Sequence, residues 1–289
     1  MMPRRRTVPR RWHGGLQELA PGVYAYIQPT GATGVSNAGL VVGGDEALAV
    51  DSLMVPRMTR AFRRAIRRVT QARVRYLVNT HFHVDHVGGN QFFQEATIIS
   101  HVNCRRELLE FGLPIDLLSQ LMPRYAQGFR QIHLVPASIT YEDKMILYVG
   151  DKEVHLLYLG RAHTQGDTLV YLPKEKVLFA GDVAFFYVTP GPYHCHVSGW
   201  IRVADLAQQL DVEAIVPGHG PVGDKKLLRE MREYLAIVRR EARKMFREGL
   251  PPEEAAQRLR VGGYYAQWAE PSRLPILVQR LYMELRGEI

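Results

Sequence analysis

One ten-residue segment constrains this chain more than any other. Residues 80–89 read Thr-His-Phe-His-Val-Asp-His-Val-Gly-Gly, which places four potential metal ligands within six residues, directly after a predicted strand. If the segment begins extended, His81 and His83 point the same way, because side chains alternate in direction along a strand. The loop can then turn Asp85 and His86 toward a second position. Imidazole nitrogens and carboxylate oxygens are ligands that zinc accepts, so the segment predicts a metal site.

Three further candidate ligands follow predicted strands later in the chain. His163 lies in a loop between two predicted strands, Asp182 follows the strand predicted at residues 177–180, and His219 follows the strand predicted at 214–216. Sheet proteins commonly place functional groups at the carboxyl ends of strands. Glycines beside these residues let the backbone turn sharply. Together with the first segment, they supply enough ligands for two metal ions.

The order of strands and helices predicts the fold class. Short apolar runs predict strands at residues 22–27, 38–42, 46–51, 75–79, 96–100, 145–149, 153–159, 168–172, 176–179 and 214–216. Helical periodicity is found at residues 60–69, over 105–129 in two pieces, and after Asp224, the predicted N-cap of a long helix. The strands fall into two groups, each accompanied by helices. This pattern predicts an α/β protein in which two sheets pack together with helices outside.

Composition excludes several classes of protein. The chain has 289 residues, of which 46% are hydrophobic and 23% charged, as in ordinary globular proteins. Much of the net charge of +8 comes from arginines at positions 4, 5, 6, 10 and 11, so the charge alone is weak support for a nucleic-acid partner. No apolar run follows this basic start, and none approaches the ~18 residues of a membrane span. With only Cys104 and Cys195, we expect a cytoplasmic protein without a membrane partner.

The motifs, taken in order, resemble the metallo-β-lactamase superfamily over residues 16–234. The His-x-His-x-Asp-His segment is highly specific to that family, and the later His-Thr, Gly-Asp and Gly-His-Gly elements come in its order. The resemblance implies an αββα sandwich of two mixed β-sheets, with the metals at one edge. It implies that one zinc ion is bound by His81, His83 and His163, a second by Asp85, His86 and His219, and that Asp182 bridges the two. It also implies that Asp51, at the end of an early strand, supports the histidine loop from behind the ligands.

Two sequence details indicate which members of the superfamily the chain resembles most. One group of true lactamases carries cysteine at the position of Asp182, whereas aspartate is the choice of glyoxalase II-like and lactonase-like members. Residues 35–43 together with 216–222 resemble a large group of bacterial members that is commonly labelled only by fold. We therefore expect a member of the glyoxalase II-like or lactonase-like branch rather than an exported, antibiotic-degrading enzyme.

These implications predict a hydrolase that acts on small molecules. Two zinc ions, or iron or manganese in their place, would hold a hydroxide that attacks a thioester, lactone, ester or amide. Asp85 is the expected catalytic residue, since it can orient the hydroxide and accept its proton. The alternatives are β-lactamase activity and a phosphodiesterase or nuclease, which the arginine-rich face at residues 60–68 would suit. We find no appended nucleic-acid-binding domain and expect no nucleic-acid partner. An iron redox protein of the same fold has no support in the sequence.

The predicted organisation has three parts. Residues 1–15 are predicted as a disordered basic tail, 16–248 as the catalytic domain, and 249–289 as a helical extension packed on the same domain. Within the catalytic domain, residues 105–129 are predicted either as a lid over an apolar pocket or as a packing insertion. Tyr187, Tyr193 and His194 follow Asp182 closely in sequence and are candidates for substrate binding, with core packing as an equal alternative. The sequence leaves open whether the protein forms a homodimer.

Overall fold

The computed structural model describes residues 7–289, so the first part of the predicted tail lies outside the described residues. Two sheets form its centre. The first has the order β1 (Gly15–Ala20), β2 (Val23–Ile27), β3 (Ala38–Gly43), β4 (Glu46–Val50), β5 (Arg73–Val78), β6 (Thr97–His101) and β7 (Ile139–Tyr141). The second has the order β12 (Ala214–His219), β11 (Val177–Phe185), β10 (Leu169–Leu172), β9 (Lys152–Leu157) and β8 (Lys144–Val149).

Both sheets are mixed. In the first, the pairs from β1 to β4 are antiparallel, and those from β4 to β7 are parallel. In the second, β11 and β12 are parallel, and the other pairs are antiparallel. This arrangement confirms the predicted fold class of two mixed sheets with helices outside.

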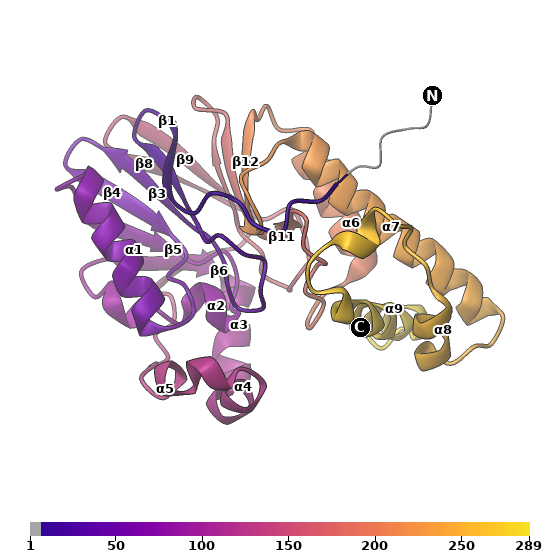
Figure 1. Cartoon of the computed structure of the whole chain (residues 1–289). Coiled ribbons are helices and arrows are strands. Elements are labelled where there is room, and N and C mark those ends of the chain that lie inside the picture. The colour runs from indigo at the N-terminus through magenta and orange to yellow at the C-terminus, as the bar shows by residue number, and fades with distance from the viewer. Residues whose placement is uncertain (1–6) are drawn as a thin grey trace.

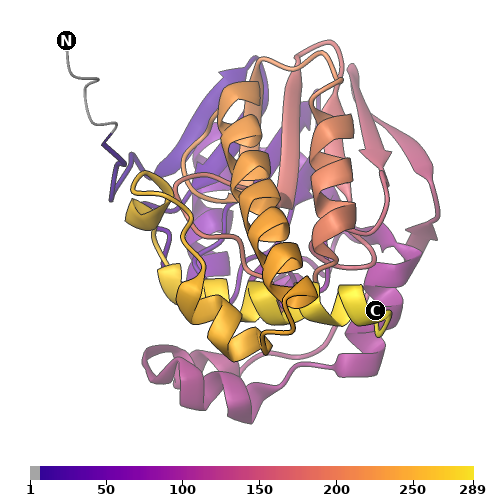
Figure 2. The same cartoon turned by 90° about the vertical axis from the view of Figure 1, so that its right-hand side faces the viewer.

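Helices cover the outer faces of the two sheets, giving four layers (Figure 1). On the side of the first sheet are α1 (Pro56–Val69), α2 (Val84–Val87) and α3 (Val102–Phe111), with α4 (Ile115–Leu121) and α5 (Ala126–Phe129) below the sheet in Figure 1. On the second lie α6 (Val197–Ala207), α7 (Lys225–Arg247), α8 (Pro252–Arg258) and α9 (Leu274–Arg286). Short 3₁₀ turns are η1 (Asn90–Phe92), η2 (Pro123–Tyr125), η3 (Tyr265–Gln267) and η4 (Pro271–Arg273). In Figure 2, α6 and α7 lie side by side and α9 crosses their lower ends.

Alternating side chains of both sheets make the central core. Val23, Ala25 and Ile27 of β2 are buried and pack in one cluster with residues such as Leu156 of β9 and Phe179 of β11. A strand that buries every second residue on this face leaves its other residues to the helical layer. The two sheets are therefore held at a fixed separation, and their adjoining edges can present side chains to one another.

The outer helices form for reasons that are visible in the sequence. α1 begins with proline at its first position, buries Phe62 and Ile66 on one face, and ends with Arg67 and Arg68, which favour the negative end of the helix dipole. α7 begins at Asp224, whose side chain accepts hydrogen bonds from the backbone nitrogens of the first turn, as predicted. Both helices are thereby fixed in length and in the face that they bury.

Some strands escaped prediction or differ in length. β1 and β7 were not predicted: β1 lies at the sheet edge with only partly buried side chains, and β7 is three residues long. The predicted strand at 176–179 extends in fact to Phe185, which places Asp182 inside β11 rather than after it. The helical region at 105–129 is broken near Gly112 and Pro114, as predicted.

The C-terminal segment packs on the outer face of the second sheet. Ala255, Trp268, Leu277 and Leu281 are buried in the same cluster as α6 and α7. Cys104 and Cys195 are both buried and free. Among residues 7–289, no helix combines the length and the apolar character needed to cross a membrane.

Candidate metal centre

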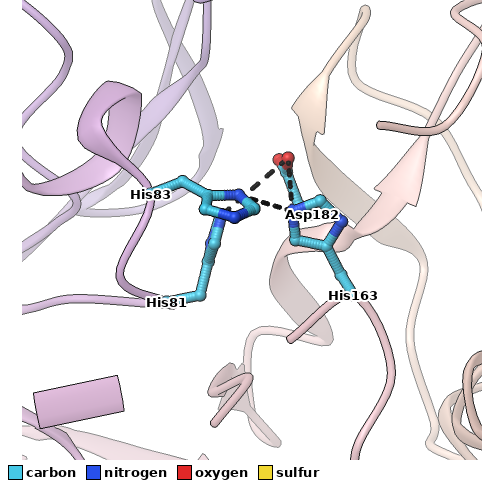
Figure 3. Close-up of side chains that lie close together, drawn as sticks. All are labelled: His81, His83, His163 and Asp182. Atoms are coloured by element: carbon cyan, nitrogen blue, oxygen red, sulfur yellow. Dashed lines mark hydrogen bonds and ion pairs between the residues drawn. The ribbon is translucent and has the colours of Figure 1, made fainter. Parts of the chain in front are cut away.

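The structure brings the seven sequence-predicted ligands together at the edge where the two sheets meet. His81 and His83 lie in the loop after β5, and the following turn, α2, carries Asp85 and His86. From the second sheet come the other three: His163 in the loop between β9 and β10, Asp182 in β11, and His219 at the end of β12. In Figure 3, His81 and His83 reach in from one side, and His163 and Asp182 from the other.

Asp182 owes its position to an irregularity within β11. The pairing of β11 with β12 shifts register around Gly181, whose φ of +49° lies in the left-handed region. A Cβ at Gly181 would stand 2.6 Å from Oγ1 of Thr80, so a side chain would also collide with the histidine loop. Such bulges change the direction of a side chain without ending the strand. The strand-end prediction for Asp182 was wrong because the sequence does not show this bulge.

The seven ligands form two adjoining groups. Each group could hold a metal ion, because its ligand atoms all lie within 4.8 Å of one another. The first group is His81, His83, His163 and Asp182, and the second is Asp85, His86 and His219.

Asp182 lies between the groups. Its Oδ2 is 3.3 Å from Nε2 of His163 in the first group and 3.4 Å from Nε2 of His219 in the second. Its Oδ1 is 3.2 Å from Nε2 of His86. This carboxylate is therefore within reach of both candidate sites.

Buried atoms without hydrogen-bond partners indicate that these residues fit a cation. Among the described residues, Nε2 of His81 is buried and forms no hydrogen bond, and Nε2 of His86 and Oδ1 of Asp182 are buried with no partner besides their 3.2 Å contact with each other. An unsatisfied buried polar atom costs about 1–3 kcal/mol, so three in one cluster call for a partner. A divalent cation is such a partner for imidazole nitrogen and carboxylate oxygen.

The protonation states favour the same interpretation. Burial lowers the pKa of His81 well below its usual value and that of His163 to about 4, which leaves these rings neutral at pH 7. Burial raises the pKa of Asp182, but His219 and His86 outweigh burial and hold that pKa well below the usual range. Burial lowers the pKa of His86, yet Asp182, Asp51 and Asp85 raise it well above the ordinary value. The carboxylates thus attract positive charge to this point, as a proton or as a metal ion.

A second set of hydrogen bonds holds the histidine loop. Oδ2 of Asp51 lies 2.7 Å from Nδ1 of His86, and Oδ1 accepts a hydrogen bond of 2.8 Å from the Thr80 backbone nitrogen. The Thr80 hydroxyl donates to Asp51 Oδ2 at 2.7 Å. The position resembles the support expected for Asp51: it fixes the ring so that Nε2 of His86 faces the cluster.

Hydrogen bonds of two further side chains, which no sequence motif predicts, hold the loops of His163 and His219. The backbone nitrogen and the hydroxyl of Thr164 donate to the two oxygens of Asp167, at 2.8 and 2.7 Å, and stiffen the loop of His163. The amide nitrogen of Asn37 donates to the backbone oxygens of Pro217 and Gly220, both at 2.9 Å, on either side of His219. A single Asp or Asn, such as Asp167 or Asn37, has no spacing signal that predicts such a role.

A cavity of about 610 Å³ opens onto the cluster. Its polar side includes His83, Asp85, His163, Asp182 and His219. Its other walls are mostly apolar, with Met54, Phe82, Phe111, Leu117, Leu118, Leu121 and Met122. Residues 105–129 therefore supply much of the apolar wall.

Two of the three candidate substrate-binding residues line this cavity. They are Tyr193, which is half-exposed, and His194, whose Nδ1 lies 2.8 Å from Nε2 of His83. Burial lowers the pKa of His194 to about 4. Tyr187 is not part of the lining and packs against the core of the second sheet instead. Arg273 lines the cavity as well, although no motif in the sequence points to it.

Comparison with known proteins identifies a family and several distant relatives. A sequence model described as the metallo-beta-lactamase superfamily matches residues 31–219. The 2,4-dinitroanisole O-demethylase subunit alpha of Nocardioides sp. (strain JS1661) is 26% identical over 71% of this chain, which spans only 55% of that relative. Metallo-beta-lactamase type 2 of Bacillus sp. (strain 170) is 26% identical, over 67% of this chain and 70% of its own length. Acyl-coenzyme A thioesterase MBLAC2 of Gallus gallus is 26% identical, over 55% of this chain and 61% of its own.

A solved structure resembles nearly the whole chain. The inverting sec-alkylsulfatase Pisa1 from Pseudomonas sp. superimposes with a TM-score of 0.76 and 17% identity, over 96% of this chain and 51% of that one. At this identity the likeness concerns the fold. It extends beyond the residues matched by the family's sequence model and so includes most of the C-terminal helices.

Proposed function

Because the chain belongs to the metallo-β-lactamase superfamily, we propose that it is a hydrolase. It binds two divalent metal ions, with zinc as the first candidate, and it cleaves a carbonyl ester or thioester of a small molecule. The observation that carries this proposal is the apolar cavity of about 610 Å³ that opens directly onto the cluster of seven ligands. Lactones and amides present the same carbonyl group and belong to the same proposal.

The ligand residues divide between the two ions as the two groups do. We assign His81, His83 and His163 to one ion, and Asp85, His86 and His219 to the other, with Asp182 shared. When bound, two such ions supply Lewis acidity and lower the pKa of water toward neutrality. The protein supplies fixed positions for them, because Asp51 and Asp167 hold the loops from behind.

Asp85 is proposed as the proton acceptor. Its Oδ2 lies 3.3 Å from Nε2 of His219, and its side chain is 14% exposed, so it borders the cavity as well as the cluster. Burial raises the pKa of Asp85, but His86 and His219 hold that pKa well below the usual range. The carboxylate is therefore charged and can orient water and accept its proton during attack on the carbonyl.

The cavity wall indicates which part of the substrate carries the apolar surface. Leu117 and Leu121 of α4 face the cavity and are 54% and 68% exposed. Burying apolar area contributes about 25 cal/mol per Å², so an acyl chain placed against α4 would be bound by it. The similarity to an acyl-coenzyme A thioesterase supports the same class of substrate.

A hydrolysis panel tests the proposal. Zinc-loaded protein is assayed with p-nitrophenyl esters and thioesters from acetyl to dodecanoyl, with lactones, with a chromogenic cephalosporin and with bis-p-nitrophenyl phosphate. We expect carbonyl esters or thioesters to be cleaved fastest, with a preference for longer chains, and we expect chelation to abolish the activity. Faster cleavage of the phosphodiester or the cephalosporin would establish the nuclease-like or lactamase alternative instead.

A further inference from the structure

Arg273 is a buried arginine in the wall of the catalytic cavity. It ends η4 and lies in the C-terminal segment, outside residues 31–219 that match the family. Its side chain lines the cavity together with the candidate ligands, and the residue is only 4% exposed. A cationic group this deeply buried is costly unless a negative charge or several hydrogen bonds compensate it.

Arg273 forms hydrogen bonds but no direct ion pair with the described residues. Nη1 donates to the backbone oxygen of Thr189 at 2.8 Å, and Nη2 donates to the hydroxyl of Thr33 at 3.2 Å. Nε is buried and forms no hydrogen bond within residues 7–289. Glu270 accepts a hydrogen bond from the same Thr33 hydroxyl at 2.6 Å, so within the described residues the carboxylate linked to the guanidinium reaches it through this hydroxyl and not directly. By contrast, buried Lys152 pairs with Glu175 at 3.0 Å.

The ring of Phe185 lies next to both the guanidinium of Arg273 and His219 of the ligand cluster. Its Cζ is 5.9 Å from the centre of the Phe185 ring, and the same ring stacks on His219 with centres 5.0 Å apart. At Gly191, a Cβ would lie 3.8 Å from Nη1 of Arg273 and 3.8 Å from Cε1 of His163. A Cβ there would also lie 3.7 Å from Cζ of Phe185, so glycine keeps this part of the cavity wall between Arg273 and His163 free of a side chain.

We propose that Arg273 binds an anionic group of the substrate, a carboxylate or a sulfate-like oxyanion, next to the bond that is cleaved. Guanidinium groups bind such anions through two parallel hydrogen bonds; Nε of Arg273 has no partner among the described residues, and each Nη, with one hydrogen bond shown, has a second N–H to donate. The substrate would then be an amphiphile, with its anionic group at Arg273 and its apolar chain against α4. The identity of the cleaved bond rests on the proposed function, whereas the binding of the anion by Arg273 does not.

Binding of simple amphiphiles tests the inference without turnover. Calorimetric titration of the metal-loaded protein uses octanoate, octyl sulfate and octan-1-ol, for wild type, Arg273→Met and Arg273→Lys. We expect Arg273→Met to weaken binding of at least one anion about 10- to 100-fold, as expected for loss of a charge-assisted pair, and that of octan-1-ol less than about threefold. Arg273→Lys keeps the charge without the planar fork, so its loss should be smaller.

Arg280 provides the matched control. It lies in α9, and its Nε and Nη2 donate to the backbone oxygen of Cys195 at 3.0 and 2.8 Å, outside the cavity lining. Arg280→Met should leave binding of both anions unchanged. An equal loss in both arginine variants, or an equal loss of octan-1-ol and the anions in Arg273→Met, would show that Arg273 only ties the loops together and would overturn the inference.

The kinetic comparison separates this inference from the proposed function. The p-nitrophenyl hemisuccinate and the neutral butyrate ester differ mainly by the carboxylate. We expect wild type to prefer the hemisuccinate and Arg273→Met to lose that preference through KM. If neither ester is cleaved while the anions still bind through Arg273, the proposed function fails and the inference stands. If both esters are cleaved equally well by both proteins, the inference fails and the proposed function stands.

Discussion

Asp85 is a charged carboxylate that borders the cavity, contacts His86 and His219, and has a side chain more exposed than that of Asp182, at 14% against 5%. We predict that Asp85→Asn loses about 10²–10⁴-fold in turnover, the usual worth of acid–base catalysis, even where metal stays bound. Asparagine still offers an oxygen to a cation, but it accepts no proton. Metal content and turnover are measured on the same preparation, with exposed Asp211→Asn as control. A variant with full metal content and more than about a tenth of wild-type turnover would reduce Asp85 to a ligand.

Asp182 is the other residue whose role can be isolated. Because its two oxygens lie within 3.4 Å of histidines from both groups, we predict that Asp182→Ala weakens binding of both metal ions together. His219→Ala removes a ligand of one group and should weaken mainly one ion. Titration of each variant with zinc distinguishes the two patterns. The same loss in both variants would contradict a shared position for Asp182.

The residues that could be predicted from sequence were those with neighbours in a pattern. His81, His83, Asp85 and His86 stand within six positions, and this spacing is informative by itself. Arg273 and Asp167 have no such spacing, and only the folded chain shows what they face. Tyr187 illustrates the converse: it lies near Asp182 in sequence, yet it is partly buried against the core of the second sheet and is not part of the cavity lining.

At the scale of elements, α3 contains a buried carboxyl group away from the candidate ligands. Burial raises the pKa of Glu107 to about 7, so the folded protein keeps this proton at pH values where the unfolded chain, with a pKa of about 4.3, has lost it. The stabilisation from the neutral form is complete below about pH 4.3 and is lost as the pH rises through about 7.

Replacing Glu107 tests that pH dependence. We predict that Glu107→Gln, which stays neutral, loses less stability than wild type when the pH rises from about 4.3 to 7. Urea unfolding at several pH values, on wild type and variant of equal metal content, gives the difference in the free energy of unfolding. Parallel curves over this interval would show that Glu107 ionises normally.

α4 is the helix against which, in the proposed function, the acyl chain of the substrate packs. We predict that Leu117→Asp lowers kcat/KM for dodecanoyl substrates about tenfold, because charge in an apolar wall opposes burial of the chain, while acetyl substrates change little. Leu109→Asp on α3 is the control, since Leu109 is 52% exposed and lies outside the cavity lining. Equal effects on long and short chains would indicate a change in folding instead of in substrate binding.

The elements that could be predicted were those with a buried face and a strong periodicity. α1 and α7 follow their apolar stripes, and the hairpin of β8 and β9 follows its turn at Gly150. β1 gives no such signal because it lies at a sheet edge with partly buried residues throughout. The continuation of β11 past Gly181 was missed because the bulge interrupts the pattern without ending the strand.

Across the whole molecule, the candidate centre depends on both sheets. The loop after β5 brings one set of ligands, and the second sheet brings the other, so neither half could assemble the cluster alone. The two groups of predicted strands were enough to predict the sandwich. They were not enough to predict that the C-terminal segment returns to the cavity with Arg273, since that placement depends on packing of α9 against α6 and α7.

Metal stoichiometry tests the central claim most directly. Protein purified with zinc supplementation and then freed of excess metal by gel filtration is analysed for metal and for protein on the same fractions. Because seven ligand residues form two groups with Asp182 between them, we predict about two metal ions per chain. One ion per chain, or none, in folded protein would contradict the two-metal centre.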